Sequence, residues 1–297
     1  MKKKRILLHS IISLFALGAV LTGCSSAKSA SSNNTKKIKV VATTDFYGEV
    51  AKNVLGKQGT VTSIINNPNI DPHDYEPTTK TAKTVSKSDI LLYNGIGYDA
   101  WAKKLSGGKK IAVGEDIMNK KDGDNEHLWY NSETMPKVAN YLATEYGKKD
   151  PKHKKQFKAN AKKYIASLKD LHTKIDKIKQ NSNNKPVDVS EPVFDYALAD
   201  MGYKVNNEHF SESVEKGTDP SPSDIKAMQN DIKNRKIAFF VENTQATDKV
   251  VANLVKLCKE HNVPVVKVTE TLPKDKNYHQ WMASQYQQVL DIQKSER

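Results

Sequence analysis

The segment that decides the fold runs from Lys152 to Gln180 and reads KHKKQFKANAKKYIASLKDLHTKIDKIKQ. It contains neither glycine nor proline. Its apolar residues recur at alternating intervals of four and three, at Phe157, Ala161, Tyr164, Leu168, Leu171, Ile175 and Ile178. This spacing places one apolar stripe along a helix. We therefore predict a continuous amphipathic helix roughly 40 Å long, at ~1.5 Å per residue. A coiled coil is the alternative, but no partner segment occurs elsewhere in the chain, which favours an intramolecular spine.

Short β-branched runs alternate with helical patterns on both sides of this helix. The strands expected before it are Ile38–Ala42, Val61–Ile65, Ile90–Tyr93 and Lys110–Val113. The strands expected after it are Val187–Val189, Tyr203–Val205, Ile237–Val241 and Val263–Thr269. Such alternation indicates βαβ units and a mainly parallel sheet. The sequence thus predicts an α/β fold in which two lobes with mainly parallel central sheets are joined by one long rigid α-helix. The predicted boundaries are 38–150 for the first lobe, 151–181 for the spine helix and 182–297 for the second lobe.

The N-terminus has the pattern of an export signal. Four basic residues, at positions 2–5, precede an uncharged segment from Ile6 to Gly23, and Leu21-Thr22-Gly23-Cys24 follows the pattern of a bacterial lipoprotein signal. We predict that residues 1–23 are a signal peptide and that Cys24 carries a lipid. Residues 24–37, without a large apolar side chain before Ile38, would then form a flexible tether. An ordinary signal peptide with an incidental Cys24, or an uncleaved anchor, is the alternative.

Charge and cysteine content narrow the classes of function. The formal net charge is +13, and it falls to +9 once the four bases of the signal peptide are removed. The lysines are dispersed and no aromatic-basic stacking pattern accompanies them, which argues against nucleic-acid binding. On an exported protein the charge favours attraction to an anionic cell envelope. The second cysteine, Cys258, would have no intrachain partner after lipidation of Cys24, so the core must hold the fold.

The stretch from Asp71 to Pro77, which reads DPHDYEP, contains the strongest candidate for chemistry. Pro72 fixes its own φ, and both prolines favour an extended conformation in the residue before them. His73 therefore presents its imidazole in a fixed direction, which a pre-formed metal site requires. A plain surface turn with His73 as a bystander is the alternative.

Three further residues are candidate ligands. His127 lies just before a predicted helix, beside Trp129, and the alternative for it is an ordinary surface histidine. Glu191 and Glu270 each follow an apolar strand of the second lobe, where α/β sheets build their sites. A salt bridge to one of the many lysines is the alternative for either glutamate. The four candidates come from four separate loops, two in each lobe.

The chain resembles the substrate-binding lipoproteins of bacterial manganese and zinc ABC importers, over nearly all of residues 20 to 295. The sharpest shared motif is Asp-Pro-His-x-Tyr-Glu-Pro, followed by the run from Asn94 to Trp101. The resemblance implies that His73, His127, Glu191 and Glu270 are the metal ligands. Two positions depart from the family pattern: Asn125-Glu126 replaces Asp-Pro before the second histidine, and Glu270 replaces an aspartate. Should Glu270 not be a ligand, Asp219 and Glu242 are the next candidates.

The resemblance also implies a function. The protein would capture Mn²⁺ or Zn²⁺ on the outer face of the bacterial cell membrane, anchored there by its lipid, and deliver the ion to an ABC permease. We expect a monomer, no catalysis and no catalytic cofactor. The carboxylates, and the lack of a long histidine-rich loop before His127, favour manganese over zinc.

Three other functions fit parts of the pattern. A secreted metallohydrolase could use Glu191 or Glu270 as a general base, but the sequence has no His-Glu-x-x-His motif. A surface adhesin with a structural metal is a second possibility. Capture of a siderophore or haem on a similar two-lobed architecture is a third, against which the clustered histidines and carboxylates favour a bare ion.

Overall fold

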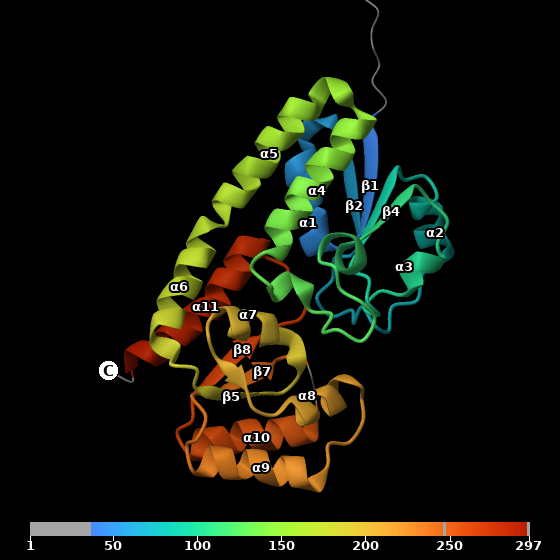
Figure 1. Ribbon diagram of the computed structural model, residues 1–297. Helices are drawn as coiled ribbons and strands as arrows, with labels where there is room; N and C mark the ends of the chain where they lie inside the picture. The colour runs from blue at the N-terminus through green and yellow to red at the C-terminus, as the bar shows by residue number, and fades with distance from the viewer. Residues whose placement is uncertain (1–36, 246–247, 296–297) are drawn as a thin grey trace, which may run out of the picture. The chain divides into compact units, whose positions relative to one another are not determined.

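Two four-stranded parallel sheets of identical strand order position the site. The computed structural model describes residues 37–245 and 248–295, so the predicted signal peptide and Cys24 lie outside the described residues. The first sheet has the order β2-β1-β3-β4 and the second the order β6-β5-β7-β8, and all pairings are parallel (Figure 1). The strands are β1 (Ile38–Thr44), β2 (Gly59–Ile65), β3 (Ile90–Tyr93), β4 (Lys109–Ala112), β5 (Pro186–Val189), β6 (Lys204–Val205), β7 (Phe240–Asn243) and β8 (Val265–Val268). The predicted α/β class is confirmed.

Helices connect the strands and cover the sheets. Those of the first part of the chain are α1 (Asp45–Leu55), α2 (Thr79–Val85), α3 (Trp101–Lys104) and α4 (Thr134–Lys149), with single turns η1 (Gly56–Gln58), η2 (Val113–Ile117), η3 (Leu128–Tyr130) and η4 (Pro151–His153). Those of the last part are η5 (Pro192–Phe194), α7 (Asp195–Asp200), α8 (Glu208–Glu215), α9 (Pro222–Lys233), α10 (Lys249–Glu260) and α11 (Tyr278–Ser295). The sequence patterns predicted all of the strands, but they assigned no helix to the region of α8.

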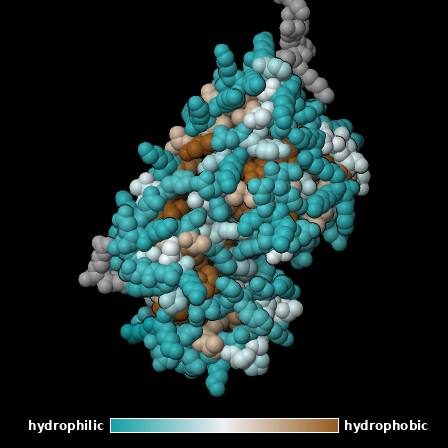
Figure 2. All heavy atoms as spheres, viewed as in Figure 1, coloured by the Kyte–Doolittle hydropathy of each residue, from teal (hydrophilic) through white to brown (hydrophobic). Residues whose placement is uncertain are grey.

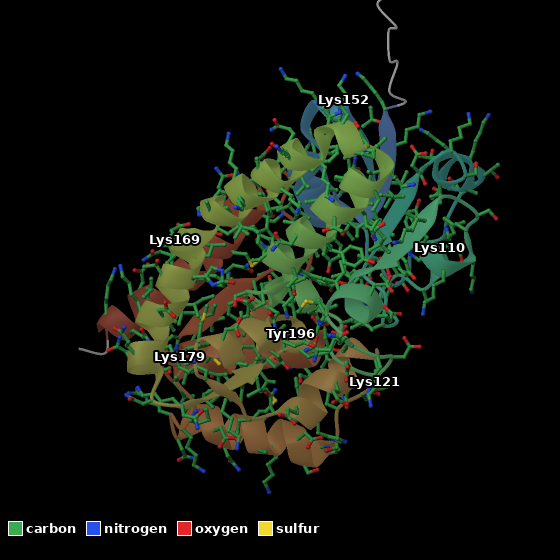
Figure 3. The ribbon with its side chains drawn as sticks, turned by 45° about the horizontal axis from the view of Figure 1, so that its top comes forward. Lys110, Lys121, Lys152, Lys169, Lys179 and Tyr196 are labelled. Carbon is green, nitrogen blue, oxygen red and sulfur yellow. The ribbon has the colours of Figure 1, made fainter. Side chains whose placement is uncertain are left out.

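The long joining helix is present and bent. It consists of α5 (Lys154–Ser167) and α6 (Lys169–Ser182), which meet at Leu168. There the backbone tightens to i→i−3 bonding, since Leu168 N–H donates to Ile165 O and Leu171 N–H to Leu168 O. The continuous apolar stripe concealed this break. Lys169 and Lys179 on this helix, and Lys152 in η4 just before it, are exposed lysines (Figure 3).

The joining helix, called the rod here, packs against helices that belong to both halves of the molecule. α5 packs on α4 and α1, whereas α6 packs on α11, the last helix of the chain. The apolar stripe that predicted the helix faces this contact, because Phe157, Ala161 and Ile178 are almost fully buried. The rod therefore braces the first sheet's helices and the C-terminal helix together.

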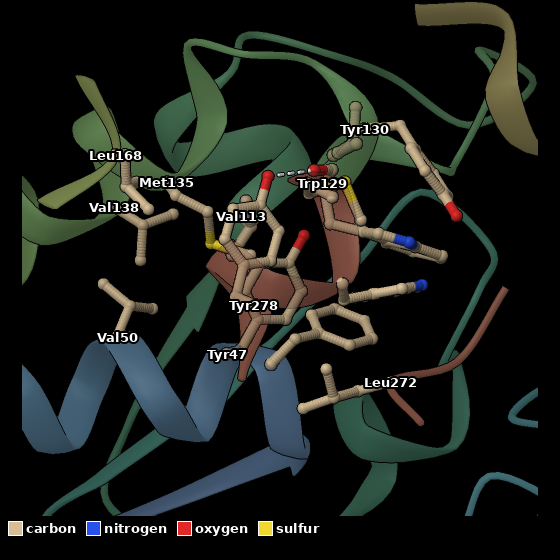
Figure 4. Packing of buried hydrophobic residues seen from close by; sticks show 14 of the residues in the cluster. Tyr47, Val50, Val113, Trp129, Tyr130, Met135, Val138, Leu168, Leu272 and Tyr278 are labelled. Carbon is tan, nitrogen blue, oxygen red and sulfur yellow. Dashed lines mark hydrogen bonds between the residues drawn. The ribbon is translucent and has the colours of Figure 1, made fainter. Parts of the chain in front are cut away.

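One hydrophobic core runs beneath both sheets. It includes side chains of β1 and β3 as well as of β5, β7 and β8. At its centre the rings of Trp129 and Tyr130 are tilted against each other with centroids 6.2 Å apart, and the Tyr130 ring meets the Trp281 ring edge-on at 5.6 Å. Tyr278 OH donates to Trp129 O over 2.6 Å (Figure 4). Burial of such aromatic area dominates core energetics. A shared core of this kind opposes wide separation of the two sheets.

The visible surface is mostly hydrophilic, with apolar atoms appearing between the charged side chains (Figure 2). Across residues 37–245 and 248–295, no helix has the length and apolar character that crossing a bilayer requires.

Candidate metal site

The candidate residues follow the carboxyl ends of the parallel strands. In each sheet the chain first adds a strand on one side of the first strand and then continues on its other side. The strand order therefore reverses between β1 and β3 in the first sheet and between β5 and β7 in the second. Ligands of open α/β sheets bind at such switch points, outside the carboxyl ends of the strands. The loop after β2 carries His73, the short loop after β5 contains Glu191, and the loop after β8 carries Glu270. Strand geometry thus delivers residues that are far apart in sequence to one region.

His73 stands at the junction of two groups of ligand atoms. Its backbone N–H donates to Asp71 Oδ1 over 2.8 Å, and Pro72 beside it is buried, so the turn is held locally. His73 Nε2 lies 3.4 Å from Glu126 Oε1 and 3.6 Å from Glu215 Oε1. Ligand atoms of Asp71, His73 and Glu270 also lie within 4.8 Å of one another. The structure therefore surrounds His73 with carboxylates.

His127 is buried and aimed into the same region. Its side chain is 1% exposed, and Nε2 lies 3.6 Å from Glu215 Oε1, the atom that also approaches His73. Nδ1 lies 3.0 Å from Asn125 Oδ1, and Asn125 Nδ2 donates to Pro192 O, which fixes the amide so that Oδ1 must accept from Nδ1–H. The lone pair is thereby placed on Nε2, which forms no hydrogen bond with any described residue. Burial lowers the pKa of His127 to about 3, so the imidazole stays neutral.

The run from Asn94 to Trp101 builds the wall of the site. Asp99 accepts hydrogen bonds from Thr43 Oγ1 and from the backbone N–H groups of Asn94 and Gly95, which fixes a tight loop. Gly95 adopts φ +81°, a conformation that favours glycine. Asn94 Nδ2 donates to the carbonyl of Glu126 and so ties this loop to the segment before His127.

Tyr98, at the centre of that loop, contacts three site residues. Its ring meets the His73 ring edge-on at 4.9 Å and lies 6.4 Å from the His127 ring. Its hydroxyl donates to Glu270 Oε1 over 2.9 Å. Tyr98 is 1% exposed and therefore rigidly packed. It positions both an imidazole and a carboxylate.

Glu270 and Glu191 line one cavity of about 400 Å³ together with Asp71. The backbone N–H of Glu270 donates to Gln245 Oε1. The Nε2 of the same glutamine donates to Pro68 O, in the loop before His73. Glu191 Oε2 accepts from Asn243 Nδ2 over 2.6 Å. Burial raises the pKa of Glu191, and the Asp71 charge raises it further, against the Asn243 hydrogen bond. Of the predicted set, the structure brings His73 and Glu270 together directly and places Glu191 beside Glu270.

Two further carboxylates lie near the histidines, and the sequence patterns singled out neither of them as a ligand. Glu215, the last residue of α8, has Oε1 3.6 Å from Nε2 of both His73 and His127. Glu126 Oε1 lies 3.4 Å from His73 Nε2, and ligand atoms of His73, Glu126 and Glu215 form one cluster within 4.8 Å. Both line a second cavity of about 510 Å³ with the two histidines. The alternative candidates Asp219 and Glu242 line neither cavity. The one available signal for Glu215 was the spacing of Phe210 and Val214, four residues apart, as on a helix face.

The carboxylates repel one another. Burial, followed by the charges of Glu270, Glu191, Glu126 and Asp71, raises the pKa of Glu215 from 4.5 to about 9. Burial also raises the pKa of Glu270 to about 8, with Asp71, Glu191 and Glu126 adding to it and the Tyr98 hydrogen bond opposing it. A dication would offset this repulsion, because an opposite charge within a few ångströms favours ionised carboxylates. Two imidazoles among carboxylate oxygens form a donor set that fits a divalent first-row ion.

We expect Tyr98→Phe to weaken metal binding by roughly tenfold, because losing one hydrogen bond to a charged group costs about 1.5 kcal/mol. The change leaves the ring and its contact with His73 in place, so the fold and its unfolding temperature without metal should be retained. Isothermal titration with Mn²⁺ measures the affinity, and Tyr141→Phe, on the partly exposed face of α4, is the matched control. Equal affinities for the two variants would remove Tyr98 from the site.

We expect the metal-free protein to lose stability as the pH rises from about 5 to 9. Glu215 and Glu270 keep their protons in the folded state up to about pH 9 and pH 8, whereas the unfolded chain loses them near 4.5. The folded state then binds more protons across this window, so the free energy of unfolding falls as the pH rises. His127 has the opposite effect on stability, because its pKa is lowered from 6.5 to about 3. Between these two pH values the unfolded state binds more protons, so His127 makes the free energy of unfolding rise with pH there, and it has no effect above about pH 6.5.

Thermal unfolding of the metal-free protein at about pH 5, 7 and 9 measures this dependence. Glu215→Gln has no proton to lose, so its unfolding temperature should fall less steeply with pH than that of the wild type. A wild-type unfolding temperature that rises steadily to pH 9, or equal slopes for both proteins, would contradict the assignment.

Solved structures share this fold. The chain matches a structure of FpvC from Pseudomonas aeruginosa in complex with Mn²⁺, with a TM-score of 0.72, 20% identity, and coverage of 88% of this chain and 100% of that one. It also matches a mutant form of a Mn-bound periplasmic metal binding protein from Candidatus Liberibacter asiaticus, with a TM-score of 0.70, 20% identity, and coverage of 86% of this chain and 99% of that one. The fold is thus that of periplasmic metal-binding proteins.

Sequence relatives specify the family. The chain is 31% identical over 275 residues to the manganese ABC transporter substrate-binding lipoprotein PsaA of Streptococcus anginosus, covering 82% of this chain and 83% of the relative. It is 30% identical over 289 residues to the manganese ABC transporter substrate-binding lipoprotein scaA of Streptococcus gordonii, covering 89% and 88%. The family model described as "Zinc-uptake complex component A periplasmic" matches residues 40–291. The chain belongs to this family, and the predicted resemblance is confirmed.

Proposed function

We propose that this protein captures a divalent first-row cation outside the cell membrane and delivers it to the permease of an ABC importer. The observation that carries the proposal is the buried, neutral His127 imidazole, whose Nε2 has no hydrogen-bond partner among the described residues and faces a carboxylate shared with His73. A buried nitrogen lone pair without a partner is costly, and a metal ion would satisfy it. The names of the relatives, which are metal and manganese transporter proteins, support the same function.

The proposed ligands are His73, His127, Glu191 and Glu270. The imidazoles come from loops associated with the first sheet and the carboxylates from the ends of β5 and β8, so the ion would connect the two sheets. The carboxylates Glu126 and Glu215 add oxygen donors to the same region. An oxygen-rich set favours manganese, whereas zinc sites carry more nitrogen and sulfur. We propose Mn²⁺ as the physiological ion.

The protein would act as a carrier and not as an enzyme. Relatives of the chain are substrate-binding proteins of transporters. Four protein ligands would close the coordination shell, whereas a catalytic metal keeps one position open for water. The lipid at Cys24 would hold a monomer at the outer face of the membrane, within reach of the permease.

Equilibrium titration of the chelator-treated protein tests the function. Mn²⁺ and Zn²⁺ should each bind saturably at one ion per chain, and competition between them should show the preference. Binding should raise the unfolding temperature, because a ligand that binds only the native state stabilises it. Absence of saturable binding, or hydrolysis of ester or peptide substrates that depends on added metal, would overturn the proposal.

A further inference from the structure

The exposed face of α8 forms an acidic wall beside the histidines. Glu208, Glu212 and Glu215 are four and three residues apart, so they share one face of the helix. All three line the cavity of about 510 Å³ that also contains His73 and His127. The other acidic residues that line the cavity are Asp124, Glu126 and Asp195. Among its lining residues only Lys216 is a lysine or arginine.

A second, independent observation shows that this cavity is built for a ligand. His127 lines it, is 1% exposed, and directs an Nε2 without a hydrogen-bond partner among the described residues toward Glu215. Glu215 Oε1 lies 3.6 Å from His127 Nε2 and 3.6 Å from His73 Nε2. The acidic wall therefore ends on two imidazoles that could coordinate the same ion.

Exposure decreases along the wall toward the histidines. The side chain of Glu212 is 59% exposed, that of Glu215 is 15% exposed, and that of His127 is 1% exposed. The helix is held in place by Asn207, whose side chain donates to Val189 O and accepts from Val189 N–H at the end of β5. A fixed row of carboxylates thus leads from solvent to the buried imidazole.

The charge of the whole chain makes such a row necessary. The full sequence has a formal net charge of +13, or +9 without the four bases of the predicted signal peptide, and this positive charge opposes the approach of a dication. Fields of exposed charges fade beyond about 8 Å at physiological ionic strength, so a local acidic cavity can dominate the encounter. Clefts lined by one sign of charge raise association rates of the opposite charge by roughly 10–10³-fold.

We propose that the α8 face formed by Glu208, Glu212 and Glu215 is the access route of the cation to its site. Glu208 and Glu212 concentrate hydrated cations at the mouth of the cavity. Glu215 gives up its proton as the ion arrives and acts as a transfer ligand that passes the ion to His73 and His127. This proposal rests on the proposed function and adds a role for residues outside the four proposed ligands. Lys216, whose Nζ lies 2.9 Å from Glu212 Oε2, occupies the route as a competing cation.

Stopped-flow measurement of Mn²⁺ association tests the route. The signal is the tryptophan fluorescence of the protein, in which Trp129 reports on the site because its ring lies 5.3 Å from that of His127. At low ionic strength, Glu208→Gln/Glu212→Gln should lower the association rate constant by about fivefold and flatten its dependence on salt. The dissociation rate constant should stay unchanged. Lys216→Gln should change the association rate in the opposite direction.

The matched control removes two charges elsewhere on the surface. Glu260→Gln/Asp291→Asn, in α10 and α11, causes the same change in net charge at side chains that are 54% and 60% exposed. Its association rate should equal that of the wild type. Equal rates for the α8 double variant and this control would overturn the access route while leaving the proposed function intact.

The transfer role of Glu215 is tested separately. Glu215→Gln should slow the association and the dissociation of Mn²⁺ together, each by roughly 10-fold, because a transfer ligand lowers the barrier in both directions. Wild-type association and dissociation rates in this variant would remove Glu215 from the route. Failure of the wild type itself to bind Mn²⁺ would instead overturn the proposed function, and this inference with it.

Discussion

His73→Ala should weaken Mn²⁺ and Zn²⁺ binding by more than about 100-fold, above the loss expected for an outer-shell partner. The expected loss is large because His73 belongs to both groups of clustered ligand atoms, with Asp71 and Glu270 on one side and with Glu126 and Glu215 on the other. A neighbouring residue cannot replace it, since the turn is held by buried Pro72 and by the hydrogen bond from His73 N–H to Asp71.

The fold should survive this change, because the His73 side chain is 34% exposed and lies outside the core. Circular dichroism and the unfolding temperature without metal should match those of the wild type. His209→Ala is the matched control, because its side chain is 80% exposed, pairs with Asp224, and lines neither cavity. Near-native metal affinity of His73→Ala, measured by titration, would contradict the ligand assignment.

Glu270→Gln should lower the affinity by roughly 100-fold and remove most of the thermal stabilisation that metal gives. Glutamine keeps the shape of the side chain and an oxygen that can accept from Tyr98 OH, so the loss isolates the effect of charge. The same change should make the metal-free protein more stable than the wild type by a margin that grows from about pH 4.5 and is complete at about pH 8, because burial and neighbouring carboxylates raise the pKa of Glu270 from 4.5 to about 8.

Scanning calorimetry with and without Mn²⁺ measures both effects in one variant. Each tenfold loss of affinity removes about 1.4 kcal/mol of metal-dependent stabilisation at saturating metal. Glu260→Gln, an exposed glutamate on α10, is the control and should leave both quantities unchanged. If Mn²⁺ raised the unfolding temperature of Glu270→Gln as much as that of the wild type, Glu270 would pair with Tyr98 for structural reasons only.

Local sequence patterns predicted the fold well because its elements are periodic. The eight strands follow β-branched runs, and the joining helix follows an apolar repeat. The bend at Leu168 was not predicted, since the repeat continues through it and no proline or glycine marks it. Its cause is a backbone hydrogen-bonding change that side-chain pattern does not report.

Candidate ligands could be proposed from the sequence where a local backbone constraint or a position after a strand marked the residue. The two prolines around His73 provided such a mark, and positions after strands marked Glu191 and Glu270. Glu215 was missed because the segment of α8 is rich in charged and polar residues and its apolar side chains are few. Tyr98 was missed as a partner of Glu270 because the two are 172 residues apart, and no local pattern reports such a contact.

The most direct measurement is anomalous X-ray diffraction from crystals of the Mn²⁺-loaded protein, collected above and below the manganese absorption edge. The central claim predicts a single anomalous peak per chain within coordination distance, on the order of 2 Å, of both His73 Nε2 and His127 Nε2, with carboxylate oxygens of Glu191 and Glu270 completing the shell. A peak elsewhere on the molecule, or none in a protein that titrates with one Mn²⁺ per chain, would contradict it.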